Sequence, residues 1–174
     1  MNAARIRTPL LGALVAAVAG LTLALVVGAK SDAATGATTA AGRAIGTAQR
    51  AAGGAPAYDI ESERRRGATV WEVKVATGGA RAVEVDVSAD GRRVLHRHAL
   101  AKPDREASLV GSTKVSLAAA LRTAGAHAHG PFDEAELDRE RGRLVWSASF
   151  GSGAAEVEVE VDARTGAVVG TDRD

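Results

Sequence analysis

Several short stretches of the chain alternate between apolar and charged or small polar residues. In VEVDV at residues 83–87 and VEVEV at 157–161, acidic residues separate the valines. Residues 58–61, 71–75 and 146–150 also place an apolar residue at every second position. Because successive side chains of a strand point to opposite faces, this pattern predicts strands with one buried face and one face in water.

Two other segments have a helical period. Apolar residues recur every three or four positions from Ala41 to Ala52, and again from Leu117 to Ala124. Ser116 precedes the second segment and is a residue type that caps helix N-termini. A short amphipathic helix and a small sheet cannot each bury an apolar face alone. We therefore expect each helix to pack on the strands that follow it.

The helix and strand patterns occur twice, 75 residues apart. At this offset Gly67 and Trp71 align with Gly142 and Trp146, and a one-residue change in a loop aligns VEVDV with VEVEV. Matches spread over a whole unit indicate duplication. The sequence therefore predicts an α+β fold of two repeated units at residues 38–98 and 113–174, joined by a linker at 99–112. Each unit is an N-terminal helix packed on a small antiparallel sheet.

The N-terminal region has a different character. Residues 10–29 contain no charged residue, and as a helix they would be about 30 Å long, enough to cross a bilayer. This length favours a membrane anchor, whereas the sequence Val-Gly-Ala at 27–29 suits signal-peptidase cleavage. Arg5 and Arg7 place the rest of the chain outside the cytoplasm. We expect a signal or anchor helix at 1–29, a flexible linker at 30–37, and an extracytoplasmic body that is membrane-anchored, or secreted if the leader is cleaved.

Composition excludes several classes of function. A formal net charge of +1 and an aromatic content of 3% argue against nucleic-acid binding, which needs a basic surface and stacking side chains. There is no cysteine, so disulfides and thiolate metal sites are excluded. No serine lies in a G-x-S-x-G turn, and the acidic run at 133–140 alternates along a predicted strand as a charged outer face. We expect no enzymatic activity and no cofactor.

The four histidines form two pairs, His96 with His98 and His127 with His129. Residues two apart on an extended segment share a face, so each pair could present two imidazoles to one metal ion. If the pairs converge, they would make a four-nitrogen site suited to zinc or copper. The alternative is that both pairs lie in separate solvated segments, because proximity in sequence does not establish convergence in space.

The order of these elements resembles that of the PepSY family. VSLAAAL at 115–121 is similar to the family's helix opening, and VEVEVDARTGAVVG at 157–170 is similar to its closing strand and turn. The first unit has SADG at 88–91 in place of the closing turn. The resemblance implies two such domains in tandem, typical of exported or membrane-tethered modules.

For function, the resemblance implies a non-catalytic binding or regulatory protein that restrains a peptidase or binds another envelope protein. A sheet edge, or the groove between the units, would contact this partner. The alternative is an extracytoplasmic module that senses a ligand or a metal. The family supplies no catalytic residues to place on this chain.

Overall fold

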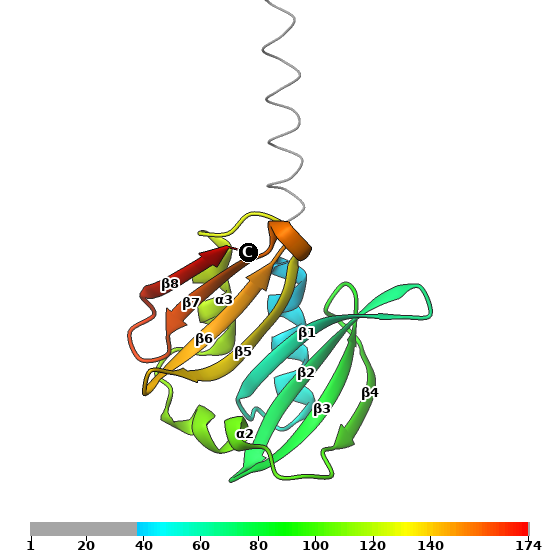
Figure 1. Cartoon of the computed structure of the whole chain (residues 1–174). Coiled ribbons are helices and arrows are strands. Elements are labelled where there is room, and N and C mark those ends of the chain that lie inside the picture. Colours follow the sequence, from blue (N-terminus) through cyan, green and yellow to red (C-terminus); the bar gives the residue numbers. More distant parts are fainter. Residues whose placement is uncertain (1–37, 174) are drawn as a thin grey trace, which may run out of the picture.

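The structure is a computed structural model that describes residues 38–173. It has one antiparallel eight-stranded sheet with the order β4-β3-β2-β1-β5-β6-β7-β8 (Figure 1). The strands are β1 (Ala57–Arg65), β2 (Ala68–Gly78), β3 (Arg81–Ser88), β4 (Val94–Ala99), β5 (Phe132–Glu140), β6 (Arg143–Phe150), β7 (Val157–Asp162) and β8 (Val168–Arg173). The predicted α+β class is confirmed.

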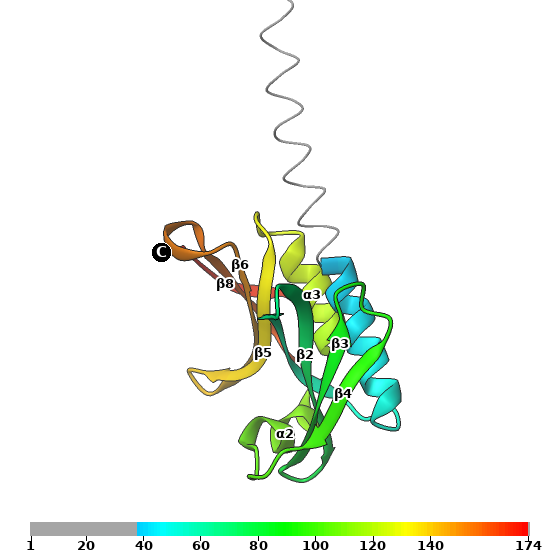
Figure 2. The same cartoon turned by 90° about the vertical axis from the view of Figure 1, so that its right-hand side faces the viewer.

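Two helices cover one face of this sheet. One spans residues 38–51, and the other is α3 (Leu117–Gly125), which begins after Ser116, whose hydroxyl accepts a hydrogen bond from the Ala119 N–H. Figure 2 shows the two helices side by side on the same side of the sheet. The opposite face of the sheet lacks a comparable helical layer among the described residues, so we call it the open face.

The core lies between the helices and the sheet. It contains the two tryptophans, Trp71 on β2 and Trp146 on β6, which are 3% and 1% exposed. Both indoles are also hydrogen-bonded, because Trp71 Nε1 donates to the Ala89 carbonyl and Trp146 Nε1 to the Val115 carbonyl, each at 3.0 Å. The rings therefore fill the core and fix the adjoining loops at the same time.

The sheet is continuous at its centre. The sequence predicts two small sheets, but β1 pairs with β5 and joins the strands of residues 57–99 to those of residues 132–173. Ile60 lies opposite Ala135 in this pair, and both are buried. The valine-rich strands β3 and β7 were predictable because each has one buried face, but the central pairing depends on contacts 75 residues apart in sequence.

The segment between the two halves is partly helical. The sequence predicts an irregular linker at 99–112, whereas the structure has α2 (Arg105–Leu109) followed by the 3-10 turn η1 (Val110–Ser112). Asp104 caps α2 by accepting hydrogen bonds from two backbone N–H groups. A second 3-10 turn, η2 (Gly153–Ala155), lies between β6 and β7.

The predicted anchor or leader at 1–29 and the linker at 30–37 lie outside the described residues. Among the helices that the structure describes, none is both long and apolar enough to span a bilayer.

Candidate functional site

The open face of the sheet carries mainly acidic side chains. These residues alternate with the buried ones that face the helices, as the pleat of a strand requires. The acidic residues at outward positions are Asp59, Glu61, Glu63, Glu72, Glu84, Asp86, Glu134, Glu136, Asp138, Glu140, Glu158, Glu160, Asp162 and Asp172. Few basic residues accompany them, chiefly Lys74, Arg65 and Arg143. The face therefore presents negative charge and can bind cations or a basic partner.

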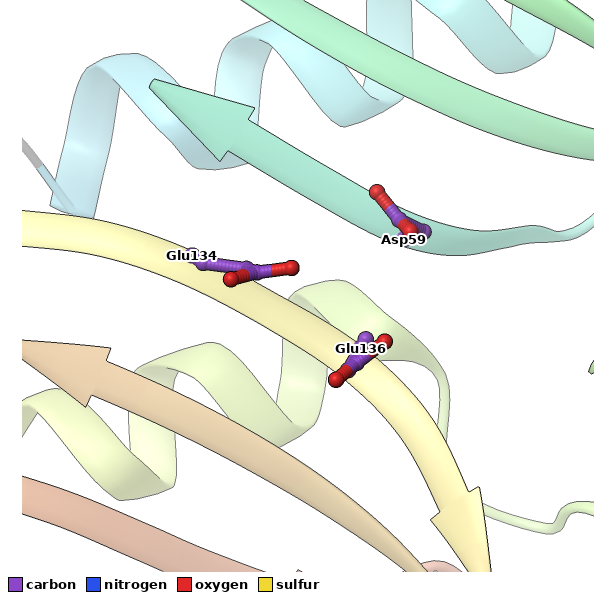
Figure 3. Close-up of side chains that lie close together, drawn as sticks. All are labelled: Asp59, Glu134 and Glu136. Atoms are coloured by element: carbon purple, nitrogen blue, oxygen red, sulfur yellow. The ribbon is translucent and has the colours of Figure 1, made fainter. Parts of the chain in front are cut away.

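Three carboxylates meet where β1 and β5 pair, and we call Asp59, Glu134 and Glu136 the junction cluster (Figure 3). Each offers an oxygen within 4.8 Å of the others. Asp59 is directly opposite Glu136 in the ladder and is buried, and its Oδ2 accepts a hydrogen bond from Lys74 Nζ at 2.7 Å. This ammonium group already supplies a positive charge to the cluster.

The junction cluster changes the acidity of its members. Burial raises the pKa of Asp59, although Lys74 partly offsets the effect. Burial, with repulsion from Glu136, Asp59 and Glu61, raises the pKa of Glu134 to about 7. The pKa of Glu136 is also raised, first by burial and then by Asp59. Removing a carboxylate from water and placing it beside others both disfavour its charged form.

A second group of carboxylates lies on β2 and β3, and we call Glu72, Glu84 and Asp86 the β2–β3 cluster. Their ligand oxygens also lie within 4.8 Å of one another. Arg65, at the end of β1, forms ion pairs with Glu72 and with Asp86 Oδ2. Burial and the adjacent Glu84 carboxyl raise the pKa of Glu72 to about 7.

Asp86 has an unusual environment within this cluster. It is 7% exposed, and while its Oδ2 is paired with Arg65, its Oδ1 is buried and has no hydrogen-bond partner. Buried polar atoms are nearly always paired, and an unpaired one costs about 1–3 kcal/mol. Such an atom can accept a hydrogen bond from water or another donor, or bind a cation.

The segment before α2 is bound to the start of β1. Tyr58 Oη donates a 2.7 Å hydrogen bond to Asp104 Oδ2, while Oδ1 of Asp104 accepts the capping N–H groups of α2. Burial acts to raise the pKa of Asp104, but these hydrogen bonds outweigh it and the pKa is lowered. Burial, together with the Asp104 carboxylate, raises the pKa of Tyr58.

The structure places the histidine pairs on different elements. His96 and His98 lie on β4 with ring centroids 5.7 Å apart, whereas His127 and His129 follow α3. All four are exposed. In residues 38–173, no group of three or more potential metal-ligating side chains within 4.8 Å includes a histidine. The geometry gives the four-histidine site no support, and it stays a prediction.

One histidine nevertheless approaches the acidic face. His98 pairs with Glu84 across the β3–β4 ladder, and its Nε2 lies 3.6 Å from Glu84 Oε1. Neither this contact nor the two carboxylate clusters are predicted from the sequence. The alternating acids of 83–87 were the available signal, but only the strand register shows which carboxylates meet.

Comparison with known proteins identifies one part of the chain. No curated protein matches the chain. A crystal structure of a candidate lipoprotein from Clostridium difficile 630 is 17% identical, covers 75% of this chain and 90% of that chain, and superimposes with a TM-score of 0.47. Residues 114–172, which include α3 and β5–β8, match the PepSY family, described as the peptidase propeptide and YPEB domain. One PepSY domain is therefore found in the chain, over residues 114–172.

Proposed function

We propose that the protein is a non-catalytic, extracytoplasmic PepSY-type binding protein that restrains a peptidase, and that edge strand β4 is its docking site. The matched PepSY domain supports the regulatory role, because such domains are typically peptidase-propeptide-like or regulatory modules. An extracytoplasmic body also agrees with the predicted leader or anchor at 10–29, through which the protein would associate with a membrane.

The first half of the chain, residues 38–98, acts in this proposal as a second and more divergent PepSY unit. Its helix followed by β1–β4 has the same order as α3 followed by β5–β8. The hairpin turns also correspond at the 75-residue offset, because Arg66 and Arg141 both have positive φ and each precedes a glycine with positive φ. Equivalent strained positions in the two halves support duplication better than similar strands alone.

The observation that carries the docking site is the exposure of β4. All six of its residues are exposed, and it is the last strand at one edge of the sheet. Val94 and Leu95 on this strand are 43% and 49% exposed, and they are two of the three large apolar residues exposed in the described part of the chain. An edge strand with free backbone groups and exposed apolar side chains can accept a partner segment as a further strand.

The ladder shows which backbone groups would make this contact. The Leu100 N–H donates to the Ala82 carbonyl, so the backbone N–H of Leu100 points toward β3. In an antiparallel ladder, successive residues alternately point their backbone N–H groups toward the neighbouring strand and away from it. The N–H groups of Arg97 and Ala99 therefore point away from β3, toward the free edge of the sheet. Proline at residue 97 would remove an outward donor without removing a β3–β4 hydrogen bond.

The test compares Arg97→Pro with Arg97→Ala in an assay of peptidase activity. Envelope extract from cells that make the protein is incubated with casein and increasing amounts of each variant. Wild type and Arg97→Ala should lower casein hydrolysis, whereas Arg97→Pro should lower it far less, with thermal melting confirming that the variants fold. No inhibition by the wild type would reject the proposed function, and equal inhibition by the two variants would reject the edge as docking site.

The alternative is a metal-sensing or ligand-sensing module. The carboxylate clusters on the open face are the observation in its favour.

A further inference from the structure

We propose that the β2–β3 cluster, formed by Glu72, Glu84 and Asp86, is a binding site for one divalent cation of the calcium type. The proposal goes beyond binding to a peptidase and does not depend on it. Its basis is the unpaired oxygen of Asp86 together with the spacing and charge of the three carboxylates.

One oxygen of the Asp86 carboxylate is available to a ligand. Asp86 Oδ1 is buried without a hydrogen bond, and the guanidinium of Arg65 bonds the other oxygen of the same carboxylate. A carboxylate oxygen can only accept, so its partner must be a donor or a cation. The neighbouring side chains of the cluster are the carboxylates of Glu72 and Glu84, which also only accept when ionised.

The spacing suits one ion. The three ligand oxygens lie within 4.8 Å of one another. Calcium binds oxygen at about 2.3–2.6 Å, so two ligands on opposite sides of one ion are about 4.8 Å apart. All three oxygens therefore fit within a single calcium coordination sphere without movement of a strand. Calcium also accepts irregular geometry and completes its shell with water.

The charge balance also favours a divalent ion. Three carboxylates and the single guanidinium of Arg65 leave two negative charges when Glu72 is ionised. Lys74 does not remove them, because its ammonium group is bonded to Asp59. Arg65 is half-exposed and also pairs with Glu63, so its side chain can withdraw from the cluster without losing every partner.

The corresponding positions in the second half of the chain do not form a cluster of three carboxylates. At the 75-residue offset Ser147 takes the place of Glu72, and after the one-residue change in a loop, at an offset of 74, Glu158 takes the place of Glu84. Ser147 Oγ donates to Glu158 Oε1 at 2.6 Å, so a hydroxyl donor satisfies that carboxylate. In the first half, Glu72 stands at the position of this serine, so a third carboxylate takes the place of the hydroxyl donor. The junction cluster also differs, because Lys74 already binds Asp59 there.

The test is calorimetric titration of the full-length protein, freed of metals by a chelator, with calcium chloride. The wild type should bind one calcium ion per chain. Glu72→Gln and Glu84→Gln keep the side-chain shape and remove one charge each, so each should weaken binding at least tenfold. The matched control is Glu158→Gln, which removes one charge from the corresponding position of the second half and should leave the affinity within twofold of wild type.

The Arg65→Gln variant gives a further test, because it should change the calcium affinity in the opposite direction. Removing the competing guanidinium should strengthen calcium binding several-fold, and calcium should raise the melting temperature of this variant more than that of the wild type. If Arg65 is instead the permanent counter-ion of the cluster, calcium will bind the Arg65→Gln variant but not the wild type, and that result overturns the proposal. Equal weakening by Glu72→Gln and Glu158→Gln would also overturn it, because binding would then reflect general surface charge.

Zinc chloride is titrated in parallel, because His98 lies beside Glu84. Zinc prefers nitrogen and sulfur ligands, and a zinc site here would need the imidazole. The calcium assignment predicts that His98→Ala leaves calcium binding unchanged. Binding of zinc alone, lost in His98→Ala, would overturn the calcium assignment.

Discussion

Ile60 lies directly opposite Ala135 in the β1–β5 ladder, and these two residues occupy the same position in the two halves of the chain, 75 residues apart. Their neighbours pair reciprocally, because Asp59 faces Glu136 and Glu61 faces Glu134. The two strands therefore meet about a local two-fold axis. The same relationship buries an apolar pair toward the helices and gathers acids on the open face.

Ile60→Ala should destabilise the whole protein. Ile60 is fully buried in a core that extends through both halves, and such truncations cost about 2–5 kcal/mol. Because the core and sheet are continuous, we also expect one unfolding transition. Urea denaturation followed by fluorescence of single-tryptophan variants, retaining Trp71 or Trp146, tests this expectation. Separate midpoints for the two probes would show that the halves unfold independently. Val94→Ala, at an exposed site, is the control.

Trp146→Ala should lower the free energy of unfolding by about 3–5 kcal/mol, because it empties a large buried site. Trp146→Phe separates the ring from its hydrogen bond, since it retains most of the volume but loses the bond to the Val115 carbonyl. The loss from that bond should be about 1 kcal/mol. Urea denaturation followed by circular dichroism gives both values, and an unchanged Trp146→Ala midpoint would contradict the inward placement of this strand.

Gly91→Ala should be much more harmful than Gly67→Ala. Both glycines have positive φ, of 75° and 82°. A Cβ at Gly91 would collide with the Ala40 carbonyl oxygen and lie 2.8 Å from the Ala44 nitrogen, whereas a Cβ at Gly67 meets nothing within 4 Å. Gly67→Ala should therefore cost only the conformational penalty of about 1–2 kcal/mol. Similar melting temperatures for the two variants would contradict close packing of the β3–β4 turn on the helix at 38–51.

The sequence predicts the interior strands but not the edges. Val83, Val85 and Val87 alternate with acids because β3 has one face in the core, and this period is visible in the sequence. In β4 every residue is exposed, and in β8 none is fully buried. Without a buried face there is no alternation, so neither edge strand was predicted. The short helix α2 was missed because its few residues give no measurable period.

The sequence predicts that acidic residues line the outer face of the sheet, but it does not predict which of them lie next to one another. The acids of 133–140 were correctly assigned to an outer face, but their contact with Asp59 depends on the β1–β5 register. Likewise, Glu72 meets Glu84 and Asp86 because β2 and β3 pair with a particular offset. Local patterns specify the face of a strand, whereas the register between strands specifies which charges become neighbours.

Stability should fall as the pH rises from about 4.5 to 7, because of Glu134. Its pKa is raised from an ordinary value of 4.5 to about 7 by burial and by Glu136. Below pH 4.5 the group is protonated in both states and no charge is buried. Between these values the unfolded chain ionises first, so the folded state loses its advantage, and the loss is complete above pH 7. Asp59 and Glu136 act in the same direction.

Glu134→Gln should therefore flatten this dependence and make the protein more stable than the wild type at pH 7.5. Solvent screening of this partly exposed group limits the gain to about 1 kcal/mol. The measurement is the free energy of unfolding in urea at pH 4.5, 6 and 7.5. Asp90→Asn is the control, and it should lower the stability at pH 7.5. The Ser88 hydroxyl lowers the pKa of Asp90, so the ionised form stabilises the fold at neutral pH. A Glu134→Gln protein with the wild-type slope would show that the junction cluster does not bury charge at neutral pH.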